Sequence, residues 1–515
     1  MKRSDFYGRL LLLTILFFAF GLRLYRLGDQ SMWWDELKTL ERATIPLQDL
    51  LADLISKRNH MPLYFLLMHP WVLVGQSAFI LRFFSVIWGT LSVAEMYRVG
   101  RLVAGRAGGI VAALLLAVAP FHVWYSQEAR MYTLLPFALL LAHDFLLQIV
   151  RREGEDGRSP SISLWLGYTL AMLVALYVHY FAIFIILAHY TYFAFHFRQM
   201  RKVALHWFIA AFVVGAFAAV WGTAVATTSG YSQAAPPWIA KIHWYDPFLT
   251  LWNFSAGFSL PLDNFAGTGL CFLYVMALLA TLPFLRKQSK NWQASRLIFF
   301  WFIAPLFITT LVSLDWALTH QSQFSIYMDR YLVIILPAFL LLVAWGLVTL
   351  TQARRRWLPL LIAIILMGTS MAQVSFHVNP EYARDDWAAA LAHITQFAEP
   401  GDVIAGRGDV SLPLTSYPHA DLPYLEFPPS DGDTITPAYD QVMRGRLATL
   451  DDNAKRIWLL EVYYSQNAHN FPDARTEQLF YETSVQRQWL EQRLPVRGHW
   501  FFPGIRLTLY DLPGL

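Results

Sequence analysis

The chain has 515 residues, 56% hydrophobic, 16% aromatic and only 15% charged, and its mean hydropathy of +0.39 excludes an ordinary soluble protein and predicts a polytopic membrane protein. The single cysteine, Cys271, excludes an internal disulfide framework and a cysteine-based metal site. The net charge of +4 excludes little, because in membrane proteins the location of Lys and Arg matters more than their sum.

The first apolar segment covers residues 10 to about 27 and follows a basic start. About 20 helical residues, each rising about 1.5 Å, cross a hydrocarbon core of about 30 Å. Arg23 and Arg26 stand where the small residues of a signal-peptide cleavage site would be expected. We therefore predict a retained first span with its amino end in the cytoplasm.

Residues 29–78 are predicted to form an outer loop. Within it, residues 46–57 (PLQDLLADLISK) repeat apolar side chains at helical spacing, which is typical of an amphipathic helix on the membrane surface. Residues 62–75 would cover only about 21 Å as a helix, and they contain His69 and Pro70. We predict that this stretch is juxtamembrane or re-entrant and does not cross.

The remaining apolar segments then give about eleven transmembrane helices, with a very tight reversal at His179-Tyr180. In this topology every basic cluster between spans falls on the cytoplasmic side, as the positive-inside rule requires, whereas a crossing at 62–75 would move these clusters outside. The predicted spans are 10–27, 79–99, 108–124, 131–150, 162–179, 181–197, 203–225, 265–285, 297–314, 331–350 and 357–374.

The composition becomes polar from Phe376 onward. We predict a transmembrane domain at 1–375, which includes the outer loop 29–78, and a soluble extracytoplasmic α/β domain at 376–515. Helices are predicted at 384–397 and around 473–494, and strands at 403–405, 456–463 and 504–509.

The outer loop carries Trp33-Trp34-Asp35-Glu36 directly after the first span. Adjacent residues on a helix point about 100° apart, so the two carboxylates cannot serve one proton. One of them, with Asp35 preferred, is a candidate general base, and the other would orient a substrate or a polar neighbour. The alternative is a surface turn in which the two carboxylates form ion pairs with Lys38 and Arg42.

Two arginines lie at predicted outer ends of spans. Arg130 ends the sequence Tyr-Ser-Gln-Glu-Ala-Arg, and Arg330 follows Asp329. A fixed guanidinium can hold a phosphate with two hydrogen bonds, and two outward arginines strengthen that interpretation. Pairing of Arg130 with Glu128, or contact with lipid headgroups, is the alternative.

Histidines and tryptophans complete the outer polar set. His60 begins the re-entrant stretch and His179 marks the tight reversal, but single histidines at helix ends are more often local hydrogen-bond partners than ligands. No metal-binding motif accompanies them, so a divalent metal is left open and no cofactor is assigned. Tryptophans on outer segments are candidates to stack on a sugar ring or to form an aromatic belt: Trp33, Trp34, Trp238, Trp244 and Trp252.

These motifs occur in an order that resembles the GT-C glycosyltransferases of family 39. The family includes protein O-mannosyltransferases, the aminoarabinose transferases that modify lipid A, and an RgtA-like bacterial branch. The resemblance covers about residues 1–350, and Met61 here replaces the first proline of the usual Pro-Pro. The motifs are Asp35-Glu36, His60-Met61-Pro62-Leu63-Tyr64, Arg130-Met131-Tyr132, His179-Tyr180-Phe181 and Arg330-Tyr331-Leu332.

The resemblance implies an inverting transfer from a polyprenyl-phosphate-linked sugar. Asp35 would be the catalytic acidic residue, with Glu36 beside it. The substrate-facing residues that it implies are His60, Arg130, Tyr132, Arg330 and Tyr331. His179 belongs to the same predicted outer set.

We therefore expect an enzyme of the bacterial plasma (inner) membrane with its site outside. Its partners would be a polyprenyl-phosphate sugar donor, a hydroxyl acceptor on protein, lipid or glycan, and membrane lipid, without nucleic acid. The main alternative is a transporter or flippase of a lipid-linked sugar, which would be expected to place charges in mid-membrane.

Overall fold

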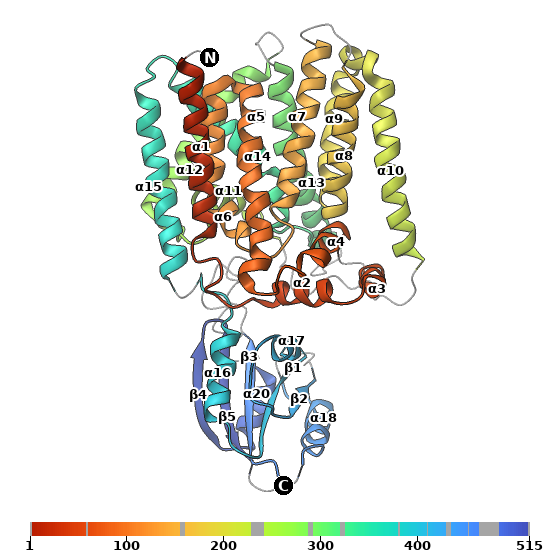
Figure 1. The fold of residues 1–515 in the computed structure, drawn as a ribbon, viewed down its shortest axis with the longest axis vertical. Helices are drawn as coiled ribbons and strands as arrows, with labels where there is room; N and C mark the ends of the chain where they lie inside the picture. Colours follow the sequence, from red (N-terminus) through yellow and green to blue (C-terminus); the bar gives the residue numbers. More distant parts are fainter. Residues whose placement is uncertain are drawn as a thin grey trace. The chain divides into compact units, whose positions relative to one another are not determined.

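The structure, a computed structural model, combines a bundle of long helices with a small mixed sheet (Figure 1). The chain divides into two compact units. The helical unit comprises Met1–Leu27 and Arg42–Ser375, and the C-terminal unit comprises Gly28–Glu41 and Phe376–Leu515. The structure describes residues 3–57, 60–154, 160–227, 242–286, 292–319, 325–379, 382–408, 410–428, 434–451, 453–462 and 484–512.

The long helices of the helical unit run side by side in Figure 1. Their bounds are α1 (Arg3–Leu24), α5 (Ala78–Val118), α7 (Leu134–Gly154), α8 (Ile162–Val178), α9 (Ala182–Met200), α10 (Ala204–Ala226), α12 (Phe265–Thr281), α13 (Trp292–Thr319), α14 (Leu336–Leu350) and α15 (Trp357–Val378).

Within the described ranges, eight helical stretches are long and apolar enough to cross a membrane. Their bounds follow the predicted spans, with two predicted spans merged in each of two stretches, and α8 is a shorter apolar helix. The number of membrane crossings, eleven, and the direction of each crossing stay predictions. The eight stretches are Phe6–Leu24, Ala78–Val118, Leu134–Arg152, Ala182–Ala226, Phe265–Leu285, Trp292–Asp315, Tyr331–Leu350 and Trp357–Val378.

Helix α5 shows why two predicted spans appear as one element. Its 41 residues would extend about 60 Å if straight, twice the thickness of a hydrocarbon core. The helix is broken at Ala104 and Gly105, and the φ of Gly105 is +71°. A Cβ on Gly109 would lie 2.7 Å from the carbonyl oxygen of Tyr97. The two halves therefore reverse at the break and pack closely because glycine has no side chain.

The tight reversal predicted at His179 is present between α8 and α9. The His179 amide donates to the Ala175 carbonyl oxygen at 3.1 Å, which closes α8. The Ala182 amide donates to the His179 carbonyl oxygen, also at 3.1 Å, which opens α9. These two backbone hydrogen bonds place His179 at the junction between the two helices.

Four short helices accompany the bundle: α3 (Leu47–Lys57), α4 (Leu63–Trp71), α6 (Pro120–Ser126) and α11 (Asp246–Ala256). In Figure 1, α3 and α4 lie at one end of the long helices. The amphipathic helix predicted at 46–57 is observed as α3, which buries Leu50 and Leu54. The stretch at 62–75 forms only the nine residues of α4.

A buried arginine joins the end of α1 to α5 and α6. Arg23 is fully buried, and its guanidinium donates to the carbonyl oxygens of Leu116 and Ala117 at 3.1 and 3.0 Å. Carbonyl groups in the last turn of a helix lack partners within the helix, so Arg23 satisfies two of them. It also contacts the ring of His122 on α6, with 2.9 Å between Nη2 and Nδ1.

The C-terminal unit is built on five strands in the order β2-β1-β3-β5-β4. Strand β1 is parallel to β2 and β3, whereas β5 is antiparallel to β3 and β4. The predicted strands are observed as β1, β3 and β5, and the predicted helix at 384–397 as α16. The helix predicted around 473–494 falls mainly outside the described residues, and its described part contains α20.

The elements of this unit are α16 (Trp387–Phe397), β1 (Asp402–Arg407), α17 (Ser411–Ser416), β2 (Tyr424–Phe427), α18 (Pro437–Leu447), β3 (Arg456–Val462), α20 (Val485–Glu491), β4 (Val496–Phe502) and β5 (Ile505–Asp511). Five of the six residues of β1 are buried, as expected for a central parallel strand. Asp402 and Arg456, paired across β1 and β3, form a buried ion pair with 2.7 Å between Oδ1 and Nε.

The stretch Gly28–Glu41 packs within the C-terminal unit although it lies early in the sequence. The Ser31 hydroxyl donates to the Asp386 carboxylate at 3.1 Å, and the Met32 amide donates to the Tyr417 hydroxyl at 2.6 Å. Helix α2 (Trp34–Thr44) starts in this stretch. The acidic pair is therefore positioned by residues more than 340 positions later in the chain.

Candidate functional site

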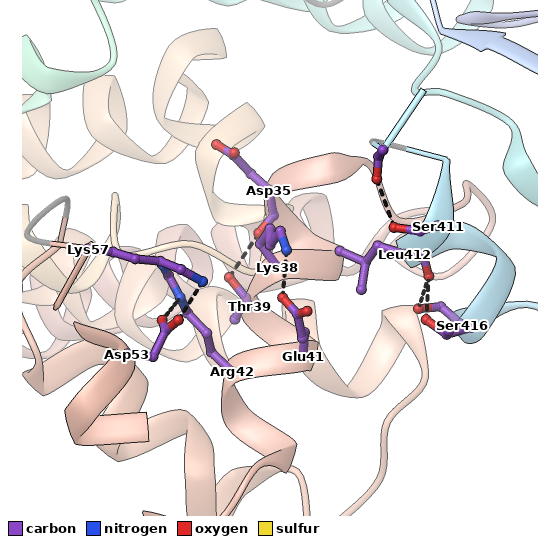
Figure 2. Close-up of polar contacts among 12 residues, drawn as sticks. Asp35, Lys38, Thr39, Glu41, Arg42, Asp53, Lys57, Ser411, Leu412 and Ser416 are labelled. Atoms are coloured by element: carbon purple, nitrogen blue, oxygen red, sulfur yellow. Dashed lines mark hydrogen bonds and ion pairs between the residues drawn. The ribbon is translucent and has the colours of Figure 1, made fainter. Parts of the chain in front are cut away.

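The two carboxylates of the acidic pair have different surroundings. Both lie in the first turn of α2, where negative charge is favoured by the helix dipole. Glu36 is fully buried, with 2.8 Å between its Oε2 and Nη1 of Arg384. Asp35 is half-buried, and Figure 2 shows its carboxylate pointing away from Lys38 and Glu41. Glu36 thus contacts a buried arginine of its own unit.

The predicted partners of the acidic pair form ion pairs with other carboxylates (Figure 2). Lys38 Nζ lies 2.8 Å from Glu41 Oε2, one helical turn along α2. Arg42 Nε lies 2.9 Å from Oδ2 of Asp53 on α3, and Lys57 contacts the same carboxylate. The interpretation of the pair as a surface turn answered by Lys38 and Arg42 is wrong for Glu36, because Glu36 is buried against Arg384.

The predicted arginines and histidines of the helical unit lie close together. Arg130 is only 2% exposed. Burial, together with the charges of Arg130 and Arg330, lowers the pKa of His179 to about 3. Burial also lowers the pKa of His60 well below its usual value, and Arg130, Arg42, His179 and Arg330 add to this effect. Both histidines are therefore neutral at physiological pH and sit in a positive field.

Aromatic rings connect these groups. The ring centroids of His179 and Tyr331 are 5.0 Å apart, and those of His179 and Tyr132 are 6.3 Å apart. Tyr132 in turn lies 5.0 Å from Tyr125. The Arg330 guanidinium carbon is 5.6 Å from the centre of the Tyr331 ring, a cation–π arrangement. The predicted substrate-facing residues of the helical unit form one cluster, called the arginine–histidine cluster below: His60, Arg130, Tyr132, His179, Arg330 and Tyr331.

The turn between α6 and α7 fixes Arg130. The Arg130 amide donates to the Glu128 carbonyl oxygen at 2.8 Å, and the Ser85 hydroxyl donates to the Arg130 carbonyl oxygen at 3.2 Å. Trp124 Nε1 donates to the Glu128 carboxylate at 2.8 Å. The backbone of Arg130 is thus tied to both α5 and its own turn. The arginine–histidine cluster belongs to the helical unit, whereas Asp35 and Glu36 belong to the C-terminal unit.

Sequence reasoning missed a group beside Arg330. The two carboxylate oxygens of Asp329 accept hydrogen bonds from Thr250 Oγ1 and Asn253 Nδ2, both on α11. The Tyr327 hydroxyl lies 2.7 Å from Thr250 Oγ1. Burial raises the pKa of Asp329 to about 6, against the opposing effect of these hydrogen bonds. The position of Asp329 next to Arg330 could have marked it as a candidate site residue. Nothing in the sequence indicated that its hydrogen-bond partners would lie on α11.

The tryptophans of the segments that were predicted to lie outside differ in exposure. Trp244 is 75% exposed, whereas Trp33 is 9% exposed. Lys38 Nζ lies 5.1 Å from the centre of the Trp34 ring, and Trp252 Nε1 donates to the Leu260 carbonyl oxygen at 3.3 Å. Stacking on a sugar stays a prediction. The fifth candidate, Trp238, lies outside the described residues.

Among the residues that the structure describes, no three or more His, Cys, Asp or Glu side chains gather in a way that could hold a metal ion. The arginine–histidine cluster combines guanidinium donors, neutral imidazoles and phenol rings, which suits an anionic group carrying phosphate oxygens.

The chain matches a protein-family model over part of its length, and it aligns with solved structures over nearly its whole length. Residues 59–222 match the family model described as dolichyl-phosphate-mannose-protein mannosyltransferase. No curated protein sequence matches the chain. The crystal structure of ArnT from Cupriavidus metallidurans bound to undecaprenyl phosphate aligns with a TM-score of 0.60 and 12% identity, covering 97% of each chain.

A second solved structure has the same architecture. The oligosaccharyltransferase AglB from Archaeoglobus fulgidus, in complex with an inhibitory peptide and a dolichol phosphate, aligns with a TM-score of 0.54 and 10% identity. The alignment covers 99% of this chain and 74% of that one. The predicted fold class, a helical membrane protein of GT-C type with a C-terminal α/β domain, is confirmed. The predicted family resemblance is confirmed over residues 59–222 by the family-model match.

Proposed function

We propose that this chain, which has the GT-C fold and matches a mannosyltransferase family model over residues 59–222, transfers a sugar from a polyprenyl-phosphate-linked donor. The acceptor would be a hydroxyl group of a protein, lipid or glycan, and the transfer would invert the anomeric configuration. The site and the residues 376–515 would face the outside of the bacterial plasma membrane. The arginine–histidine cluster is the observation that carries the proposal.

The chemistry follows from what each group can do. The acceptor oxygen forms a bond to the anomeric carbon while the bond from that carbon to the phosphate oxygen breaks. Asp35 takes the acceptor's proton as general base. Arg130 and Arg330 stabilise the charge that grows on the departing lipid phosphate, with Tyr132 beside them. Polyprenyl phosphate leaves and the sugar remains on the acceptor.

The remaining cluster residues would shape the phosphate pocket. His60 and His179 are neutral, so each can offer one N–H donor and one acceptor without adding charge. Tyr331 packs against His179 and orients its ring. Glu36 would act indirectly, because its buried ion pair with Arg384 fixes the first turn of α2 that presents Asp35. Glu36 would then orient a neighbour while Asp35 performs the proton transfer.

The test uses membranes that contain the full chain and a radiolabelled sugar on polyprenyl phosphate. The wild-type protein should attach label covalently to an acceptor, and Asp35→Asn should attach almost none. Asp49→Asn, which alters an exposed carboxylate on α3, is the matched control and should retain full transfer. Full transfer by Asp35→Asn would remove Asp35 from the mechanism.

The alternative, a transporter or flippase, predicts movement of the lipid-linked sugar without a new covalent bond. The helical unit does hold charged groups inside long helices: Arg98 on α5 lies 2.7 Å from Asp144 on α7, and 3.3 Å from Glu95. Arg98 lies close to the α5 break and its side chain is 56% exposed. Label that crosses vesicles but never becomes bound to an acceptor would favour the alternative.

A further inference from the structure

The segment that carries Arg330 is anchored to α11 rather than to its own helix. Arg330 and Tyr331 stand at the start of the turn that leads into α14. The residue before them, Asp329, has hydrogen-bond donors from α11 on both of its carboxylate oxygens: Thr250 on one and Asn253 on the other. Thr250 is fully buried and Asn253 is 8% exposed. Buried hydrogen bonds to a carboxylate are among the stronger ones in proteins.

A hydroxyl chain extends this anchor. Thr250 has one hydroxyl proton, and the charged oxygen of Asp329 is its best acceptor. The Tyr327 hydroxyl, 2.7 Å from Thr250 Oγ1, then donates to the threonine oxygen. Tyr327 itself is 7% exposed. The segment from Tyr327 to Asp329 is therefore tied to α11 at both ends.

Helix α11 is tied in turn to the helix that leads to Arg130. The rings of Phe254 on α11 and Phe121 on α6 are 5.0 Å apart in an edge-to-face arrangement. A Cβ on Gly257, which ends α11 with a φ of +75°, would lie 2.7 Å from the Cβ of Pro120. Only glycine satisfies both this backbone conformation and this close approach. Helix α6, which leads to Arg130, therefore packs directly against α11, which anchors the segment of Arg330.

We propose that Asp329 is a positioning residue that, through Thr250 and Asn253 of α11, holds Arg330 at a fixed place relative to Arg130 for binding of a lipid phosphate. The inference rests on the proposed function, because it assigns the phosphate to the two arginines. A displacement of about 1 Å between preorganised groups is enough to weaken a phosphate contact strongly. Asp329 contacts no substrate in this arrangement and acts through Arg330.

The charges around Asp329 give the anchor a pH dependence. Asp246 on α11, Tyr125 on α6 and Tyr327 on its own segment interact electrostatically with Asp329, and Arg330 is its neighbour in the chain. Because the pKa of Asp329 is raised to about 6, its carboxylate loses its charge as the pH falls below about 6. The charged hydrogen bonds to α11 then weaken, and so should the affinity for the lipid phosphate.

The experiment measures binding of undecaprenyl phosphate to the purified full-length protein in detergent. Asp329→Asn should lower the affinity about tenfold, the size expected for losing a hydrogen bond to a charged group. Asn253→Leu removes the same contact from the side of α11 and should cause a similar loss. Asp263→Asn, at an exposed carboxylate that follows α11, is the control and should bind like the wild-type protein.

An exchange of the two side chains separates positioning from general damage. Asp329→Asn combined with Asn253→Asp restores an amide–carboxylate pair in reverse and should recover most of the affinity. The wild-type affinity should also fall from pH 7 to pH 5 more than that of Asp329→Asn, since titration of the phosphate affects both proteins equally. Asp329→Asn with wild-type affinity, or an exchange without recovery in a folded protein, would overturn the inference.

Failure of the proposed function gives a different result. If the wild-type protein binds undecaprenyl phosphate and Arg330→Ala lowers the affinity while Asp329→Asn does not, the phosphate site stands and the anchor is wrong. If the wild-type protein does not bind undecaprenyl phosphate at any pH, the proposed donor and the inference that rests on it are both wrong.

Discussion

Two groups of buried charges, one in each unit, are arranged differently. In the C-terminal unit, Asp402 and Arg456 meet at 2.7 Å across neighbouring strands, and Glu36 meets Arg384 at 2.8 Å. In the helical unit, Arg130 and Arg330 both lower the pKa of His179. Opposite charges in contact stabilise a fold or fix its geometry, whereas like charges that converge are typical of a site for an anion. The difference separates a structural use of arginine from a functional one.

The largest expected effect concerns the structural pair. Asp402→Ala removes the buried partner of the Arg456 guanidinium and leaves it paired with Glu399 at 2.8 Å. We therefore expect the lower end of the usual cost of breaking a buried pair, about 3 kcal/mol. Chemical denaturation of the full-length protein should show this loss in the C-terminal unit, while undecaprenyl phosphate binding to the folded protein stays unchanged. A loss of binding without a loss of stability would contradict the assignment of this pair to structure.

Arg130→Ala should strongly reduce sugar transfer by the folded protein. We expect transfer from a polyprenyl-phosphate sugar to fall about 10²-fold or more, because a preorganised charge contact to the departing phosphate is lost. Arg130→Lys should recover part of the rate, since a lysine keeps the charge but not the two-point contact. Equal transfer by the alanine variant and the wild-type protein would exclude Arg130 from the site.

His179 should make the fold sensitive to acid. Its folded pKa of about 3 lies below the usual value of 6.5, so the unfolded chain binds more protons between these two values and stability falls as the pH falls through that window. His179→Gln should reduce this acid dependence of the thermal unfolding midpoint between pH 6.5 and pH 4. An unchanged acid dependence would show that folding does not shift the pKa of His179.

The smallest effect is expected at the surface pair of α2. Lys38 and Glu41 are 30% and 42% exposed, and exposed pairs of this kind contribute about 0–1 kcal/mol. Lys38→Ala should therefore leave both the unfolding midpoint and sugar transfer close to wild type. A large loss of transfer would show that Lys38, next to Asp35 on the same helix, takes part in the reaction.

Much of the fold follows from local sequence patterns. Apolar segments of about 20 residues predict helices that cross a membrane whatever surrounds them. The shift to a polar composition at Phe376 predicts a separate α/β unit. The break in α5 at Ala104 and Gly105 falls between the predicted spans 79–99 and 108–124, but the sequence did not predict how closely the two halves pack. Their close packing depends on glycines that carry no hydropathy signal.

The candidate site was predictable as a set of residue types and not as an arrangement. The order of the acidic pair, the histidines and the arginines predicted His60, Arg130, His179 and Arg330, which lie in one cluster in the structure. Asp329 was seen only as a neighbour of Arg330, because its partner Asn253 lies 76 residues away. A hydrogen bond between such distant positions leaves no periodicity or motif.

The sequence by itself determined the membrane-spanning character, the separate polar unit and the identity of the charged residues, since these depend on composition and on neighbours along the chain. Only the tertiary structure decided which of these charges meet. It buried Glu36 against Arg384, brought three distant segments of the helical unit around His179, and tied Arg330 to α11. The physical reason is that the field felt by an ionisable group depends on distances through space, which packing sets.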